Sequence, residues 1–199
     1  MNLPMFRLAR VLALGFLVLS TAPAAADVSQ DAQTFVSDNG DRMIAILDEP
    51  AGAERSEHFY NWLREVFALD KLAELALGPY RQNASDEQLA EYNQAFADYI
   101  VTTYLTRFNA FTGYSFQVGQ AKPMNNNDVA VRTTITDQSG KPIIVDFRVR
   151  PTGGSFQVID VVVEGLSMLK TQRDEFSAVI QRKGLDGLIA SLQESSLSQ

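Results

Sequence analysis

The spacing of apolar residues changes near Tyr114, and this change restricts the fold more than any other feature of the chain. Before it, apolar side chains recur every three or four residues, as on one face of a helix. From Phe116 to Val163 they follow a period of two, as in strands. Beyond Gly165 the helical spacing returns. Helices first, strands second and helices last predict an α+β fold.

The N-terminal half is predicted to be helical. We expect helices at residues 28–48, 54–67, 71–77 and 86 to about 108–111. Asp70 is expected to cap the third helix, and Ser85 with Gln88 forms a capping box for the fourth. The fourth helix carries an aromatic-rich stripe: Leu89, Tyr92, Phe96, Ile100, Tyr104, Phe108 and Phe111. Core packing alone explains such a stripe, and the alternative is that some of its rings line a cavity.

The central segment is predicted to form a four-stranded antiparallel meander, with turns at 125–128, 139–140 and 151–154. Its last strand is apolar on both alternating faces. A strict alternation places Val158, Asp160 and Val162 on one face and Ile159, Val161 and Val163 on the other. Since an exposed antiparallel strand should alternate apolar and polar residues, something must cover the second face. The strand can be covered by helices on both faces, or by helices on one face and a ligand on the other.

The C-terminal segment is predicted to be helical again. Ser167 is positioned to cap the helix, Gly184 interrupts it, and residues 185–192 form a last short helix. The whole pattern predicts a twisted four-stranded sheet wrapped by helices.

The first 26 residues are predicted to be a cleaved signal peptide. Arg7 and Arg10 precede the apolar stretch 11–20, and Ala24-Ala25-Ala26 provides a small-residue cleavage site. The stretch is too short for a membrane-spanning helix, which needs about 20 apolar residues. Residues 27–199 then form a single exported domain.

Composition excludes several classes of function. The chain has no cysteine, so disulfides, thiolate chemistry and a lipoprotein anchor are excluded. Its formal net charge of −7 argues against nucleic acid or anionic membrane surfaces as partners.

Candidate catalytic residues are few, and none forms a complete motif. His58 is the only histidine, which makes a zinc site improbable. Ser167 and Lys170 match S-x-x-K, but the companion motifs of serine–lysine hydrolases are missing. Asp160 and Glu164 lie in or at the end of the last strand, and Asp160 is expected to pair with Arg148 or Arg150. The sequence therefore predicts a protein that is not an enzyme.

The segment DVVVEGLSMLKTQRDEF, residues 160–176, resembles the signature D-v-x-v-E-G-v-S-x-x-x-x-x-R-x-x-F of the MlaC-like family, also called toluene-tolerance or ABC-transporter auxiliary proteins. Matching positions are Asp160, Val161, Val163, Glu164, Gly165, Ser167, Arg173 and Phe176. Ala76-Leu77-Gly78 before Tyr80, and FRV in the third strand, also fit in order. Arg81 and Phe156 stand where the family commonly has tryptophan. VEGLSM followed by TQR looks closest to the hopanoid-associated HpnM branch.

The resemblance implies a periplasmic lipid carrier. Acyl chains of a phospholipid occupy an apolar cavity between sheet and helices. The carrier moves lipid between an inner-membrane ABC transporter with an MCE-domain partner and an outer-membrane lipoprotein–porin complex, which maintains outer-membrane lipid asymmetry. A monomer without cofactor or metal is implied.

The predicted cavity lining combines the aromatic stripe, the sheet face and neighbouring apolar residues. It comprises Phe67, Leu75, Tyr80, Phe96, Ile100, Tyr104, Phe108, Val131, Val145, Phe147, Val161, Val163, Leu166 and Met168. Three alternatives stay open: a carrier of a hopanoid-type lipid, a ligand-free adaptor of a transporter, and a small hydrolase using Ser167.

Overall fold

The computed structural model describes residues 25–108 and 113–197. The predicted signal peptide therefore lies almost entirely outside the described residues, as does Phe111 of the aromatic stripe. Within those residues, no helix is long and apolar enough to cross a bilayer.

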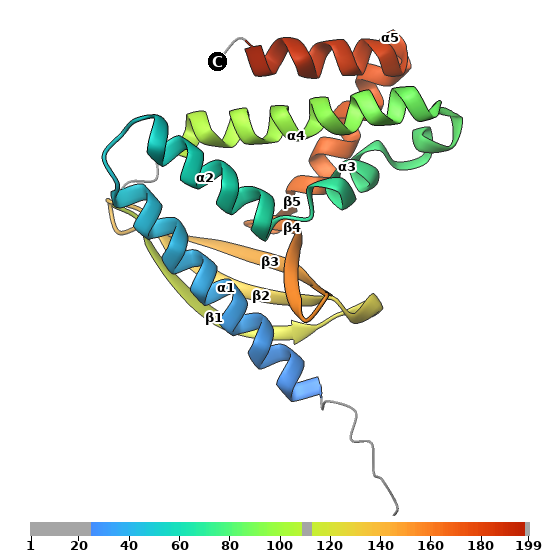
Figure 1. The fold of residues 1–199 in the computed structure, drawn as a ribbon. Helices are drawn as coiled ribbons and strands as arrows, with labels where there is room; N and C mark the ends of the chain where they lie inside the picture. Colours follow the sequence, from blue (N-terminus) through green and yellow to red (C-terminus); the bar gives the residue numbers. More distant parts are fainter. Residues whose placement is uncertain (1–24, 109–112, 198–199) are drawn as a thin grey trace, which may run out of the picture.

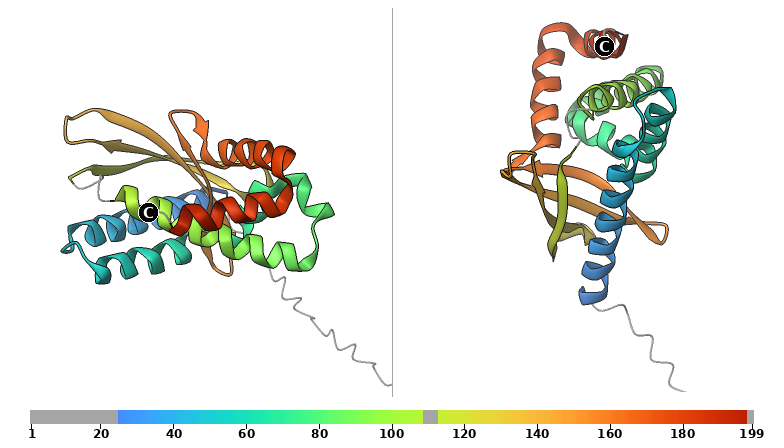
Figure 2. Two further views of the ribbon diagram at one scale, coloured as in Figure 1. Left: turned by 90° about the horizontal axis from the view of Figure 1, so that it is seen from above. Right: turned by 90° about the vertical axis from the view of Figure 1, so that its left-hand side faces the viewer.

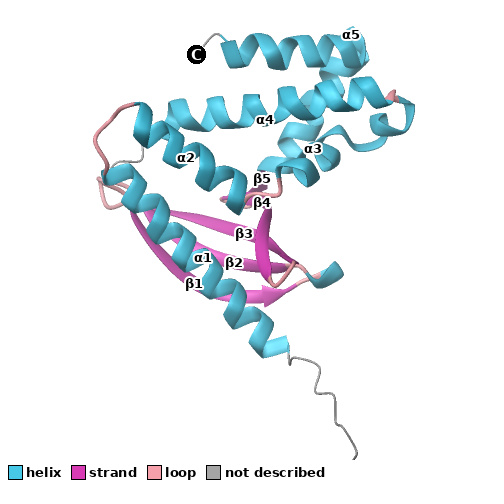
Figure 3. Ribbon diagram, in the orientation of Figure 1, coloured by secondary structure: helices cyan, strands magenta, loops and turns pink. Residues whose placement is uncertain are grey.

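Helices make up the N-terminal half, as predicted (Figure 1). In chain order they are α1 (Ala25–Asp48), α2 (Ala53–Val66), α3 (Leu69–Leu77), the 3₁₀ helix η1 (Gly78–Asn83) and α4 (Asp86–Phe108). α1 runs diagonally across the sheet (Figures 1 and 3). α2 lies between α1 and α4.

Local capping predictions had mixed outcomes. The capping box of α4 is confirmed: the Ser85 amide donates to Gln88 Oε1, and the Gln88 amide donates to Ser85 Oγ, both at 3.1 Å. The predicted cap at Asp70 is wrong. α3 begins at Leu69, two residues earlier than predicted, and Asp70 lies within its first turn.

The described strands form one antiparallel sheet in the order β1-β2-β3-β4-β5. The strands are β1 (Ser115–Pro123), β2 (Val129–Thr136), β3 (Pro142–Thr152), β4 (Ser155–Val163) and β5 (Leu166–Ser167). The predicted α+β fold is confirmed, with one strand more than expected. Glu164 and Gly165 have φ values of 48° and 83°, so the chain turns sharply and pairs two further residues with β4.

A β-bulge at Ile159 corrects the predicted faces of β4. Val149 pairs with Val158 and Arg148 pairs with Asp160, which leaves Ile159 as the extra residue. Val158 therefore shares a face with Val161, not with Asp160 as strict alternation predicted.

One face of the sheet is apolar and is covered by α1 and α2. Its cluster, called cluster one here, comprises the buried residues Ala32, Val36, Leu47, Phe59, Trp62, Leu63, Val66, Val101, Val129, Val131, Val149 and Val158. α1 approaches β1 closely because residue 40 is glycine: a Cβ there would clash with the ring of Phe116. The Phe35 ring packs on Phe156 with centroids 5.9 Å apart.

A second apolar cluster, cluster two, joins α3, α4 and α5 (Met168–Leu197). Its buried members are Ala73, Ala76, Leu77, Tyr92, Ala95, Phe96, Phe176, Leu188, Ile189 and Leu192. α5 rises from the sheet and then bends to run beside α4 (Figure 2). The bend is at Gly184, whose φ of 74° confirms the predicted interruption.

The other face of the sheet carries a charged group that the sequence analysis missed. Asp128, directly before β2, has a fully buried side chain. Arg148 Nε donates to Asp128 Oδ2 at 2.9 Å, and Arg150 Nε donates to Asp128 Oδ1 at 2.6 Å. Burial raises the pKa of Asp128, but the hydrogen bonds from both guanidiniums outweigh burial and hold this pKa below its usual value.

Candidate functional site

Cluster one contains five of the predicted lining residues. Val131 is a fully buried member, and four half-buried residues pack against it: Phe67, Ile100, Phe147 and Val161. They come from α4, from the segment after α2 and from three adjacent strands. Of the five, only Ile100 belongs to α4, and the lining as a whole stays a prediction.

Two other predicted residues lie in cluster two. Phe96 is buried between Tyr92 and Phe176, and Tyr80 packs at the edge of this cluster. The Tyr80 hydroxyl lies 2.9 Å from Ser177 Oγ, so it joins η1 to α5. Ile100 is the one predicted residue that packs against both clusters, and it therefore lies where they meet.

The remaining predicted residues are not members of either cluster within the described part of the chain. Val145 is buried, whereas Leu75, Val163 and Met168 are half-buried. Tyr104 and Leu166 are 41% and 57% exposed. Phe108 ends α4, and its side chain lies outside the described residues.

Partial exposure of apolar side chains is the distinctive property of this region. Phe67, Phe147, Val161 and Val163 are half-buried, whereas Val131 beneath them is fully buried. α4 packs chiefly on α5, α3 and α2, and no strand is among its main neighbours. The apolar sheet face is thus covered by α1 and α2, whereas α4 packs mainly on other helices.

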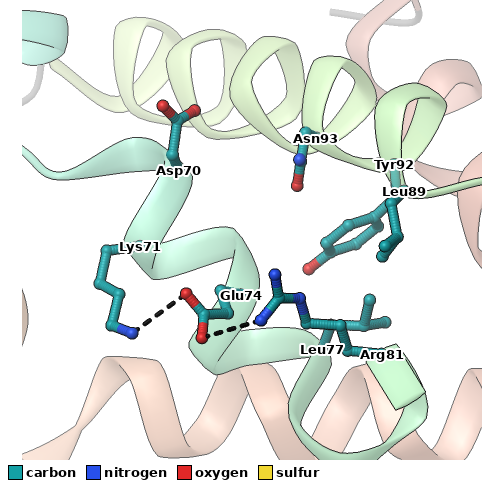
Figure 4. A pocket seen from close by; sticks show the side chains of 8 residues that line it. All are labelled: Asp70, Lys71, Glu74, Leu77, Arg81, Leu89, Tyr92 and Asn93. Carbon is teal, nitrogen blue, oxygen red and sulfur yellow. Dashed lines mark hydrogen bonds and ion pairs between the residues drawn. The ribbon is translucent and has the colours of Figure 1, made fainter. Parts of the chain in front are cut away.

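Two pockets among the described residues lie elsewhere, and charged side chains line part of each. One, of about 360 Å³, lies between α3, η1 and α4 (Figure 4). Glu74 there accepts from Lys71 at 3.0 Å and from Arg81 at 3.2 Å. The other, of about 240 Å³, adjoins it through Asp70 and Lys71. Phe67 is the only predicted lining residue that borders either pocket.

Ser167 and Asp160 build a helix terminus. Ser167 Oγ donates to Asp160 Oδ2 at 2.7 Å and accepts from the Lys170 amide at 3.0 Å. Asp160 Oδ1 accepts from the Leu169 amide at 3.1 Å. The predicted cap at Ser167 is confirmed, and the expected pairing of Asp160 with Arg148 or Arg150 is wrong. The Lys170 amine pairs with Asp174 at 2.6 Å, so it does not activate Ser167.

Replacement of Ser167 by alanine tests this assignment. We expect Ser167→Ala to lower the free energy of unfolding by about 1–2 kcal/mol, because α5 loses its cap and Asp160 loses a donor. Urea unfolding measures the change. Ser191→Ala is the control, since Ser191 Oγ bonds only the Gly187 carbonyl of its own helix. An equal, negligible loss in both variants would contradict the capping role.

His58 has the structural role expected of a solvated helix residue. Its Nδ1 lies 2.8 Å from Glu49 Oε2, and this hydrogen bond raises the pKa of His58. Among residues 25–108 and 113–197, no group of three or more His, Cys, Asp or Glu side chains is arranged to hold a metal ion.

The fold and this site define a class: an α+β binding domain whose apolar sheet face meets a helix layer. Comparison with known proteins identifies the family within this class. The profile of the family described as MlaC protein matches residues 37–194. The Intermembrane phospholipid transport system binding protein MlaC of Haemophilus influenzae is 26% identical over 148 residues, 68% of this chain and 69% of that protein. This chain belongs to the MlaC family.

Further relatives agree with this assignment. The Toluene tolerance protein ttg2D of Pseudomonas putida is 25% identical over 107 residues, which are 54% of this chain and 50% of that protein. The structure also resembles that of a phospholipid-binding protein from Ralstonia solanacearum in complex with a phospholipid. The TM-score is 0.72 at 23% identity, covering 84% of this chain and 97% of the other. The HpnM branch, suggested by VEGLSM and TQR, stays a prediction.

Proposed function

We propose that this chain binds phospholipid and carries it between membranes, without catalysing a reaction. The observation that supports this best is the set of half-buried apolar side chains around cluster one, from three strands, from α4 and from the segment after α2. The relative from Haemophilus influenzae is named for phospholipid transport, and the Ralstonia solanacearum protein holds a phospholipid. Family membership supports a carrier over the hydrolase considered for Ser167.

In this proposal the acyl chains lie between the apolar sheet face and α4. The lining is the predicted set, with Phe67, Ile100, Phe147 and Val161 at its centre. Each buried methylene contributes about 0.8 kcal/mol, so acyl chains are held firmly without polar contacts. Entry of the chains requires α4 to move relative to the sheet.

The proposed place of action is the periplasm. The predicted signal peptide, residues 1–26, would direct export. The carrier would receive and deliver phospholipid at an inner-membrane ABC transporter with an MCE-domain partner and at an outer-membrane lipoprotein–porin complex. Such transport would maintain the lipid asymmetry of the outer membrane.

Lipid analysis of the purified mature protein tests the function. We expect about one phospholipid per chain in native mass spectra, with the lipid identified after solvent extraction. A hopanoid in its place would assign the protein to the other branch. A protein that carries no lipid and takes up none from added vesicles would contradict the carrier and favour a ligand-free adaptor.

A further inference from the structure

Two buried side-chain donors have no hydrogen-bond partner in the described part of the chain. They are Trp62 Nε1 and Thr103 Oγ1. Trp62 is only 6% exposed, and its ring packs against Phe59 and Phe67 with centroids 5.8 and 5.9 Å away. Buried polar groups in native proteins are rarely left unpaired, because they have lost their hydrogen bonds to water without replacement. Each of these atoms therefore requires an explanation.

Both donors belong to helices that border the proposed lipid site. Trp62 is a buried member of cluster one on α2. Thr103 follows Ile100 by three residues on α4, so the two side chains lie on one face of that helix. Ile100 packs where the two clusters meet, and α2 packs against α4. The unpaired donors thus lie on two helices that pack against each other.

The chemistry of these donors indicates a neutral acceptor. An indole N–H and a hydroxyl carry no charge, and the neighbours of Trp62 in cluster one are apolar. A phosphate brought among them would lose its hydration without gaining a counter-charge. An ester carbonyl is neutral, accepts hydrogen bonds, and lies at the top of each acyl chain of a phospholipid.

We propose that Trp62 Nε1 and Thr103 Oγ1 donate hydrogen bonds to the ester carbonyls of a bound diacyl phospholipid. This inference rests on the proposed function and adds a selectivity for the type of linkage in the lipid. The site distinguishes ester-linked from ether-linked lipids, because an ether-linked chain has no carbonyl. A buried site that loses a hydrogen-bond acceptor leaves its donor unpaired and binds more weakly.

A competition between two lipids tests the proposal on the unaltered protein. Delipidated protein is mixed with equal amounts of dipalmitoyl phosphatidylglycerol and its dihexadecyl ether analogue, and bound lipid is counted by native mass spectrometry. We expect a preference of about five- to tenfold for the ester lipid. Trp62 is the only tryptophan in the chain, so its fluorescence should also shift further to the red with the ester lipid. Equal binding would overturn the proposal and keep the carrier function, whereas binding of neither lipid would overturn both.

Variants assign the preference to the two donors. Thr103→Val removes a donor and keeps the shape, and Trp62→Phe removes a donor and leaves a smaller aromatic ring. We expect each to reduce the preference several-fold. Tyr92→Phe is the matched control. Its buried hydroxyl already donates to the Ala73 carbonyl at 3.0 Å, within cluster two, so its loss should leave the preference unchanged. A full preference retained in a folded Trp62→Phe, Thr103→Val double variant would overturn the proposal.

Discussion

Replacement of Ile100 by tryptophan is expected to remove most of the phospholipid that purifies with this protein. Ile100 packs against both clusters, at the proposed place of the acyl chains. An indole there would displace about three methylene groups at about 0.8 kcal/mol each, or about 2.4 kcal/mol, which is roughly a fiftyfold loss of affinity. Native mass spectrometry of the purified variant measures the lipid content per chain.

A matched control separates a blocked site from a disturbed helix. Leu89 is also half-buried on α4, but it packs in cluster two and faces the pocket of about 360 Å³. Leu89→Trp should therefore keep its lipid. Val161→Trp, which enlarges the opposing sheet face, should lose it. Full lipid occupancy in a folded Ile100→Trp variant would contradict the proposed location of the chains.

The aromatic stripe of α4 shows how far periodicity reaches. The spacing identified the buried face, including Tyr92, Phe96 and Ile100, and the structure confirms their burial or partial burial. It did not identify what the face packs against. Tyr92 and Phe96 pack on Phe176 of α5 rather than on the sheet. Periodicity describes one helix, whereas the partner depends on where a distant segment folds.

The fourth strand shows a different limit. One extra residue, Ile159, reverses every face assigned by alternation after it. Nothing in the segment Val-Ile-Asp-Val marks which residue bulges. The register places Asp160 opposite Arg148. Its carboxylate nevertheless accepts hydrogen bonds at the start of α5, whereas both arginines pair with Asp128. By contrast, the helix caps at Ser85 and Ser167 were predictable, because the amides that they accept from lie three residues away.

Loss of the Asp128 carboxylate is expected to cause the largest loss of stability. Its side chain is fully buried and binds both Arg148 and Arg150, which are themselves about 30% exposed. Asp128→Ala leaves two neighbouring guanidiniums without a counter-charge, so the free energy of unfolding should fall by about 3 kcal/mol. Urea unfolding at pH 7 measures this. Asp146→Ala, which breaks a more exposed pair with Arg132, should cost less than about 1 kcal/mol. Equal losses in the two variants would contradict the special role of Asp128.

The contribution of Asp128 should also depend on pH in one direction. Its pKa is lowered in the folded protein relative to an unfolded value of about 3.9, because the arginine hydrogen bonds outweigh burial. Its stabilisation is therefore complete above about pH 4 and is lost as the pH falls through the lower, folded-state pKa. The difference in unfolding free energy between the native protein and Asp128→Asn should stay constant from pH 7 to about pH 5 and shrink below pH 4. A difference that grows as the pH falls would mean that the arginines do not hold the carboxylate ionised.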